Sequence, residues 1–523
     1  MKFTCKRVTV LLLLTGLCVF TLLGRLKFDY MVNTTMEKQI KKHMALENGT
    51  ESFKNWVDPP VPVLFQIYLF DIVNPMEVIK NQAPPVVMEK GPYVYKLHGH
   101  KENITYHDNY TVSFREPEGY TYVEELSVGP ETDTFTSLND FFFVLAFSLQ
   151  NQSALVQNAV SDFFEVMGDS AFITRSLRDI WWGYDDVVLK KVADFLKSLH
   201  VNVTIPSKFG FNMDKNNTDG GVLTIYSGLS GNFDNFEKID RWNGLRKLTS
   251  WNSDYANRIE GSDSSVQPPP LQPNKNLTFF DAHLQRTLNL VYRGPVQVCG
   301  VDAFRYVVPF SDFANAEDNP DNAGFCTPDV NHCLPSGALN LSVTSRGAPL
   351  VLSLPHFVGG DPYYQKQVRG MRPLPEKHQT FIEYHTLTGV NLRSARRYQV
   401  VMHVKPMKHF PAFSNLPEVY LPIMWIDGTS QIDDKTLKLF KTKMQDMLDM
   451  MVYVKGGMVG IVCLLALSVV ALILYWTRKD RKSREASGTN RADDDDELLL
   501  PADPQAINTV YDDLHSRSPA LRS

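Results

Sequence analysis

The segment GGMVGIVCLLALSVVALILYW, Gly456–Trp476, decides how this 523-residue chain is organised. Its 21 residues include no Asp, Glu, Lys or Arg. A helix needs roughly 20 apolar residues to cross a hydrocarbon core about 30 Å thick, so the segment predicts a transmembrane helix. Basic residues follow it closely and mark the cytosolic side of the membrane. They are Arg478, Lys479, Arg481, Lys482 and Arg484.

A second uncharged run, VTVLLLLTGLCVFTLLG, covers Val8–Gly24. Its 17 residues reach the lower limit for a membrane-spanning helix. A cleaved signal peptide is the alternative, but no alanine precedes Ala45, so no Ala-x-Ala-like cleavage site follows the run. We therefore expect an uncleaved anchor. The expected layout is a cytosolic segment at 1–7, a transmembrane helix at 8–24, a lumenal or extracellular domain at 25–455, a second transmembrane helix at 456–476 and a cytosolic tail at 477–523.

Glycosylation sequons give an independent indication of topology. Every N-x-S/T sequon falls between the two apolar segments, where a lumenal or extracellular domain would be glycosylated. The predicted acceptors are Asn33, Asn48, Asn103, Asn109, Asn151, Asn202, Asn216, Asn276 and Asn340.

Composition and motifs argue against several classes of function. A net charge of −5 with 43% hydrophobic residues does not favour nucleic acid as a partner. The chain has neither a G-x-S-x-G nor an H-E-x-x-H motif, so we expect no enzyme and no cofactor. His332 beside Cys333 lacks a second ligand pair, and no metal is expected. A two-span ligand-gated channel shares the topology, but neither predicted span contains an ionisable residue to mark a pore.

Most of the region between the spans reads as antiparallel strands in one large domain. PVLFQIYLFDI (62–72), DAFRYVVPF (302–310) and RRYQVVMHVKP (396–406) are rich in β-branched and aromatic residues. No regular alternation of strand and long helix appears, so parallel pairing is not expected. A proline-rich stretch at 262–273 predicts a surface loop rather than a domain boundary.

Residues 138–200 differ, because their apolar residues recur at nearly helical spacing. We predict a helical insertion whose FFFVLAF run (141–147) either packs in the core or faces a ligand. From Glu116 to Thr174 there are ten acids and no Lys or Arg, which indicates either an ordinary solvated face or a surface for basic partners. The candidate cargo- or lipid-binding residues are Phe141, Phe142, Phe143, Asp162, Phe163, Phe164, Glu165, Met167 and Asp169.

Six motifs, in this order, resemble the class B scavenger receptor family. They are MEKGPYVYK (88–96), LRDIWWGYDD (177–186), DAFRYVVP (302–309), DNAGFC (321–326), LPHF (354–357) and LTGVNLRSARRYQV (387–400). The resemblance implies an α+β fold: two transmembrane helices flank a large antiparallel β-barrel with a helical cap at 138–200 and a hydrophobic tunnel. It also implies a Cys326–Cys333 disulfide.

The same resemblance implies a receptor that binds lumenal protein or lipoprotein cargo. Cholesterol or another lipid would pass through the tunnel to the membrane lipids. Such passage requires no covalent chemistry, because the tunnel only has to keep the apolar surface of the lipid out of water.

The tail sequence RADDDDELLLPAD, Arg491–Asp503, predicts a sorting signal. An acid precedes a leucine pair by four residues twice, which is the pattern of an acidic dileucine signal read by clathrin adaptors. YDDL at 511–514 has the pattern of an endocytic tyrosine signal. We therefore expect a lysosomal or late-endosomal membrane protein, with the plasma membrane as the alternative. The signal residues are Asp494, Asp495, Leu498, Leu499, Leu500, Tyr511 and Leu514.

Three smaller features complete the predictions. Cys5, at the membrane edge, is a candidate for palmitoylation or is an unmodified thiol. Cys299 is either a free buried thiol or a competitor for one of the other two external cysteines, Cys326 and Cys333. Gly456 and Gly460 form a G-x-x-x-G pattern that is compatible with homo-oligomers.

Overall fold

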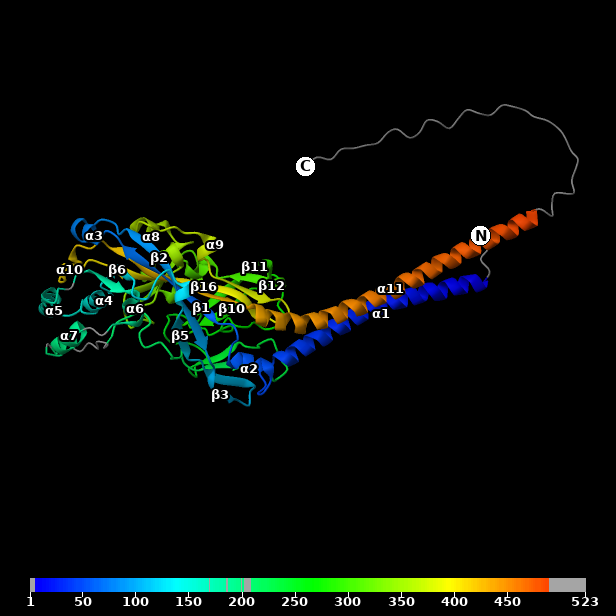
Figure 1. The fold of residues 1–523 in the computed structure, drawn as a ribbon, viewed down its shortest axis with the longest axis horizontal. Coiled ribbons are helices and arrows are strands. Elements are labelled where there is room, and N and C mark those ends of the chain that lie inside the picture. Colours follow the sequence, from blue (N-terminus) through cyan, green and yellow to red (C-terminus); the bar gives the residue numbers. More distant parts are fainter. Residues whose placement is uncertain (1–4, 169, 185–186, 199, 202–207, 489–523) are drawn as a thin grey trace, which may run out of the picture. The chain divides into compact units, whose positions relative to one another are not determined.

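The computed structural model describes residues 5–168, 170–184, 187–198, 200–201 and 208–488. Two compact units are present, and each is described by itself. One consists of Met1–Asp29 and Met451–Ser523, and the other of Tyr30–Met450. The second unit contains the sheets and the short helices (Figure 1).

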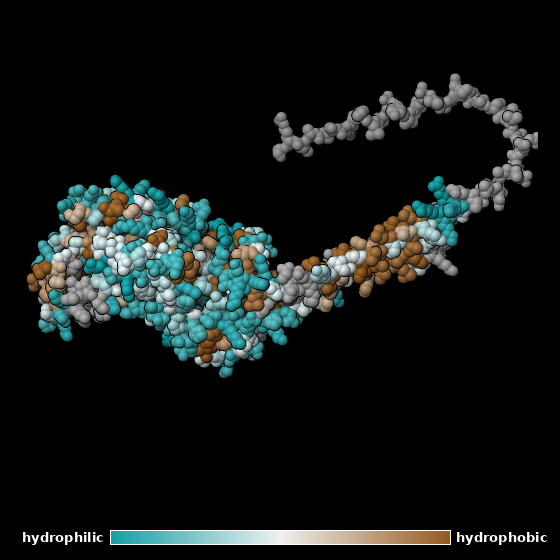
Figure 2. All heavy atoms as spheres, in the orientation of Figure 1, coloured by the Kyte–Doolittle hydropathy of each residue, from teal (hydrophilic) through white to brown (hydrophobic). Residues whose placement is uncertain are grey.

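The first unit holds the apolar parts of the two longest helices, α1 (Cys5–Met44) and α11 (Asp434–Gly488). Within α11, Val452–Ser483 is long and apolar enough to cross a membrane, and it contains the predicted 456–476 span. Figure 2 shows hydrophobic residues gathered along this helix. Leu12–Gly24 of α1 is a shorter apolar stretch, so the first span stays a prediction.

An 11-stranded antiparallel sheet forms the centre of the Tyr30–Met450 unit. Its pairing path runs β10-β11-β12-β15-β16-β17-β1-β2-β5, and β14, paired with β13, attaches through β16. The strands are β1 (Val63–Ile72), β2 (Val87–Gly99), β5 (Glu118–Tyr122), β10 (Leu277–Asp281), β11 (Arg286–Val298), β12 (Val301–Val307), β13 (Ala338–Asn340), β14 (Leu350–Ser353), β15 (Phe381–His385), β16 (Asn391–Val404) and β17 (Val419–Gln431).

The register of this sheet explains its stability. β17 lies between β16 and β1, and eight of its first ten residues are apolar, as expected for a strand buried on both faces. Tyr68 of β1 is paired with Trp425 of β17, and their rings stack with centroids 3.9 Å apart. Such cross-strand aromatic pairs each contribute up to about 1 kcal/mol. The predicted strands at 62–72, 302–310 and 396–406 are therefore confirmed.

Among the described residues the pairing path has two ends, β10 and β5, so hydrogen bonds between these strands do not close it into a ring. The barrel that the family resemblance implies stays a prediction. A second sheet contains β3 (Glu102–Tyr106), β4 (Thr111–Arg115), β8 (Leu223–Tyr226) and β9 (Ile239–Trp242). The antiparallel, mixed α and β character is confirmed.

The described residues between 138 and 200 form the predicted helical cluster. Two short strands, β6 (Thr134–Leu138) and β7 (Phe172–Ser176), pair with each other and carry the helices between and after them. These helices are α4 (Asp140–Ser148), α5 (Ala154–Val166), α6 (Leu177–Trp182) and α7 (Val187–Ser198). The cluster lies at one end of the Tyr30–Met450 unit, and α2 (Glu51–Val57) and β3 lie at the opposite end (Figure 1). We refer to residues 138–200 as the cap.

The remaining short elements connect the strands of the unit. They are α3 (Pro75–Asn81), α8 (Pro362–Gln367), α9 (Pro375–His378), α10 (Pro411–Ser414) and the 3-10 helices Glu124–Leu126, Phe310–Phe313, Pro320–Phe325, Val330–His332 and Pro355–Phe357.

Candidate functional site

A cavity of about 1340 Å³ lies within the Tyr30–Met450 unit. This volume exceeds the roughly 300–1,000 Å³ of typical small-molecule pockets. Segments from 39 to 440 contribute to its wall, among them the end of α1, α2, the end of β2 and the start of the β17–α11 connection. None of the described residues between 138 and 200 lines this cavity, which lies at the α2 end, so a tunnel that begins at the cap stays a prediction.

Much of the cavity wall is apolar. Buried side chains of the hydrophobic core around α2 line part of the cavity. Residues at the C-terminal end of α1 and at the N-terminal end of α11 also line it. The apolar wall residues include Ile40, Leu46, Val61, Phe236, Ile239, Val266, Phe280, Val390, Ile432, Leu439 and Phe440. A large cavity with such walls fits the hydrocarbon part of a lipid, because burying apolar surface gains roughly 25 cal/mol per Å².

One part of the wall carries a polar cluster of buried and half-buried side chains, which we define as Trp56, Lys101, Glu116, Glu237 and Asp263. The Lys101 ammonium is 5% exposed and lies 2.9 Å from Glu116 Oε1. Its Nζ atom also lies 5.5 Å from the centre of the Trp56 ring, a cation–π arrangement. Burial lowers the pKa of Lys101, but the charges of Glu116 and Asp263 more than offset it, so the pKa lies above its ordinary value.

Glu237 is the unusual member of this polar cluster. It is 2% exposed, and burial, followed by the negative charge of Asp263, raises its pKa from 4.5 to about 8. The carboxyl is therefore mostly uncharged at neutral pH. A desolvated titratable group on a cavity wall is a physical indication of a functional site. No short motif marks these five residues, so sequence reasoning missed them.

The aromatic residues proposed for cargo binding in the cap are packed inside it. Phe142 stacks on Phe164 with ring centroids 3.9 Å apart and meets Phe413 of α10 at 4.6 Å. Phe141, Phe142, Phe143 and Phe164 are at most 7% exposed, which supports core packing as the role of the FFFVLAF run. Phe163 and Met167 are half-buried, Asp162 and Glu165 are exposed, and Asp169 lies outside the described residues.

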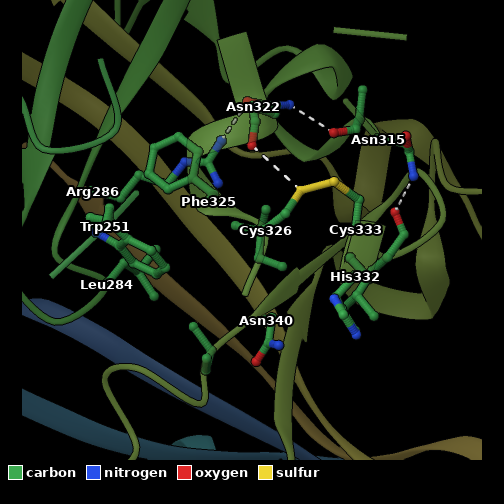
Figure 3. Close-up of a pocket in the computed structure, with 15 residues that line it drawn as sticks. Trp251, Leu284, Arg286, Asn315, Asn322, Phe325, Cys326, His332, Cys333 and Asn340 are labelled. Carbon is green, nitrogen blue, oxygen red and sulfur yellow. Dashed lines mark hydrogen bonds between the residues drawn. A yellow bond between two sulfur atoms is a disulfide. The ribbon is translucent and has the colours of Figure 1, made fainter. Parts of the chain in front are cut away.

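The disulfide implied by the resemblance is present between Cys326 and Cys333. Figure 3 shows it beside a small pocket of about 40 Å³, which has room for only a few water molecules. In the same pocket Arg286 donates to Asn322 Oδ1 at 2.9 Å and lies 3.6 Å above the Phe325 ring. These contacts stabilise the segment from Asn322 to Cys333, and we assign no ligand to the pocket. Cys299 is exposed and forms no disulfide.

Two of the six family motifs meet in space. His356 of LPHF donates through Nε2 to Glu89 of MEKGPYVYK at 2.6 Å, because its Nδ1 already accepts the Arg372 backbone N–H. The Trp425 indole donates to the same Glu89 carboxylate at 2.8 Å. Burial raises the pKa of Glu89, but these two hydrogen bonds more than offset it and leave the pKa below its usual value. The motifs therefore connect β2, β17 and the 3-10 turn at Pro355–Phe357.

The predicted glycosylation sites lie largely at the surface. Asn48, Asn103, Asn109, Asn151, Asn216 and Asn276 are exposed, whereas Asn340 is half-buried in β13. The side chains of Asn33 and Cys5 are not described, and Asn202 lies outside the described residues. The signal residues between Asp494 and Leu514 also lie outside them, so the sorting signals stay predictions.

Known proteins resemble this chain over nearly its full length. The model of the CD36 family matches residues 14–474. Scavenger receptor class B member 1 from Bos taurus is 32% identical over 491 residues, covering 92% of this chain and 94% of that protein. Lysosome membrane protein 2 from Homo sapiens is 33% identical over 442 residues, covering 84% of this chain and 88% of that protein. By both measures, the chain belongs to the CD36 family.

Proposed function

We propose that this chain is a lysosomal or late-endosomal membrane receptor that binds lumenal cargo and passes lipid, cholesterol included, to the membrane. The observation that carries the proposal is the 1340 Å³ cavity with its apolar wall. Along the chain, α1 and α11 lead directly from the apolar segments to residues that line this cavity. A lipid inside it would be shielded from water until it enters the bilayer.

The cap is the proposed contact surface for cargo. Its exposed acids, Asp162 and Glu165 on α5, suit a basic surface on a protein partner better than an anionic lipoprotein. Receptor function needs no catalytic group, in keeping with the relatives, which are named as a scavenger receptor and a lysosome membrane protein. Clathrin adaptors are the proposed cytosolic partners, and homo-oligomers through the Gly456 region remain part of the proposal.

A cell-surface scavenger receptor is the second candidate, since a relative is named scavenger receptor class B member 1. The acidic dileucine pattern of the tail favours the lysosomal location. The two candidates share the cavity and differ in where the protein resides.

Ala282→Trp is expected to reduce lipid transfer several-fold. Ala282 lines the cavity directly after β10, and an indole there would occupy space that the lipid needs. The measurement is uptake of a fluorescent sterol by cells that express equal amounts of each protein. Ala348→Trp is the matched control, because Ala348 is equally half-buried but does not line the cavity. Equal transfer by wild type and Ala282→Trp would remove the cavity from the proposal.

The triple change Leu498→Ala, Leu499→Ala and Leu500→Ala is expected to move the protein from lysosomes to the plasma membrane. Alanine leaves the adaptor pocket without the apolar side chains that it binds. The measurement is immunofluorescence of full-length protein tagged in the external domain, with Tyr511→Ala as a separate comparison. If the parent protein already resides at the surface and the triple variant does not change that, the cell-surface candidate replaces the lysosomal one.

A further inference from the structure

One buried group on the cavity wall lacks the partner that buried polar groups normally have. The Trp56 indole nitrogen is buried and has no hydrogen-bond acceptor among the described residues. The Glu237 carboxyl is buried nearby, close enough for the Trp56 side chain to lower its pKa, but no bond of normal hydrogen-bond geometry joins the two groups. A buried N–H without an acceptor costs about 1–3 kcal/mol, so a molecule that enters the cavity gains by supplying that acceptor.

From these contacts we infer that Trp56 and Glu237 form a subsite for the hydroxyl group of a neutral lipid. The inference rests on the proposed function and deepens it by naming the ligand's chemical class. A hydroxyl both donates and accepts hydrogen bonds. Its oxygen accepts the Trp56 N–H, and its hydrogen is donated to Glu237. The ligand hydroxyl then supplies the acceptor that the Trp56 N–H lacks and makes a second hydrogen bond to Glu237.

The surrounding charges disfavour a carboxylate head group. Lys101 is paired with Glu116, and Asp263 adds a further negative charge that acts on both Lys101 and Glu237. The polar cluster, with Glu237 uncharged, thus has a net negative charge. A fatty-acid carboxylate would be repelled by it and could not donate a hydrogen bond.

An ammonium head group fits the subsite less well than a hydroxyl. The negative cluster attracts a cation, but an ammonium has only donors and leaves the Trp56 N–H without an acceptor. A hydroxyl is the head group of sterols, long-chain alcohols and diacylglycerols alike. The subsite recognises this shared group and does not distinguish the hydrocarbon that carries it.

Three C18 lipids that differ only in head group test the inference: oleyl alcohol, oleate and oleylamine. The full chain in lipid nanodiscs is loaded with tritiated oleyl alcohol, and each unlabelled lipid competes for it, with protein-free nanodiscs as background. We expect oleyl alcohol to compete about tenfold better than oleate and better than oleylamine. Equal competition by oleate, or the best competition by oleylamine, overturns the inference.

Variants locate the effect at the two residues. Trp56→Phe keeps an aromatic ring and removes the N–H, so the preference for alcohol over oleate should fall about two- to tenfold. Glu237→Gln, which still donates and accepts, should keep the preference, and Glu237→Met should lose it. Trp251→Phe is the control, because Trp251 is as buried as Trp56, donates to Gln285 and does not line this cavity. If Trp56→Phe weakens all three lipids equally, the indole N–H does not recognise the hydroxyl.

The outcomes separate this inference from the proposed function. If Ala282→Trp binds all three lipids as well as wild type does, the cavity is not the binding site and both ideas fail. If Ala282→Trp loses binding while wild type treats alcohol and oleate alike, the cavity stands and the hydroxyl subsite alone is wrong.

Discussion

Asp140→Asn is expected to stabilise the protein by roughly 2–4 kcal/mol at pH 7. Asp140 opens α4 in the cap, is 7% exposed, and its Oδ1 atom has no hydrogen-bond partner among the described residues. Burial raises its pKa from 3.8 to about 8. At pH 7 the folded protein must therefore hold a proton that the unfolded chain releases, and this costs about 4 kcal/mol. The buried amide of asparagine offsets part of the gain.

The pH dependence of the stability difference between Asp140→Asn and wild type tests whether the Asp140 carboxyl is protonated in the folded protein. Between pH 8 and pH 3.8 the folded state binds one proton more than the unfolded state at this residue, so the wild type gains stability as the pH falls. Asparagine does not titrate, so the advantage of Asp140→Asn should shrink by roughly 2–3 kcal/mol between pH 7 and pH 5. Urea unfolding of the full chain in detergent at both pH values measures it. Asp162→Asn, an exposed acid on α5, is the control, expected within about 0.5 kcal/mol of wild type. A pH-independent difference at Asp140 would show that its carboxyl is charged when folded.

Phe142→Ala is expected to destabilise the protein by about 3–5 kcal/mol. Phe142 is 1% exposed and packs between Phe164 of α5 and Phe413 of α10, so alanine would leave a void that these fixed elements cannot fill. The residue thus joins the cap to the rest of the core. The same unfolding experiment measures the loss, together with the amount of protein that leaves the endoplasmic reticulum.

Two comparisons separate packing from cargo contact in the cap. Leu155→Ala removes an apolar side chain that is 80% exposed on α5 and should change stability by no more than about 0.5 kcal/mol. Asp162→Lys with Glu165→Lys should alter cargo binding while leaving the unfolding midpoint nearly unchanged, because both side chains are exposed. A Phe142→Ala protein that is as stable as wild type but loses cargo would assign Phe142 to the binding surface instead.

The family motifs gain a physical explanation from the structure. Glu89 and His356 are 267 residues apart in sequence, yet their hydrogen bond fixes β2 against the turn that precedes α8. A composition or periodicity argument does not detect such a pair. The family resemblance matched the two motifs that contain these residues, but it did not pair them; the hydrogen bond is seen only in the structure.

Local sequence determined the elements. The helix over 456–476, the strands at 62–72 and 396–406 and the helices of the cap each depend on neighbours within a few residues, so these elements were predicted correctly. That 456–476 crosses a membrane stays a prediction. The sequence did not decide whether the FFFVLAF run (141–147) packs in the core or faces a ligand. The spacing of apolar residues shows which face of a helix is apolar, but not what that face contacts. Whether the sheet closes as a barrel depends on contacts between distant strands, and the pairing path among the described residues does not close it.

Only the tertiary structure determined the cavity and the state of its charged groups. Trp56, Lys101 and Glu237 come from α2, from the residue before β3 and from the loop before β9, and long-range strand pairing brings them to one wall. The pKa of Glu237 depends on how far water is excluded and on the charges of Asp263 and Lys101. Desolvation and charge–charge distances are properties of the folded arrangement, and no stretch of sequence contains them.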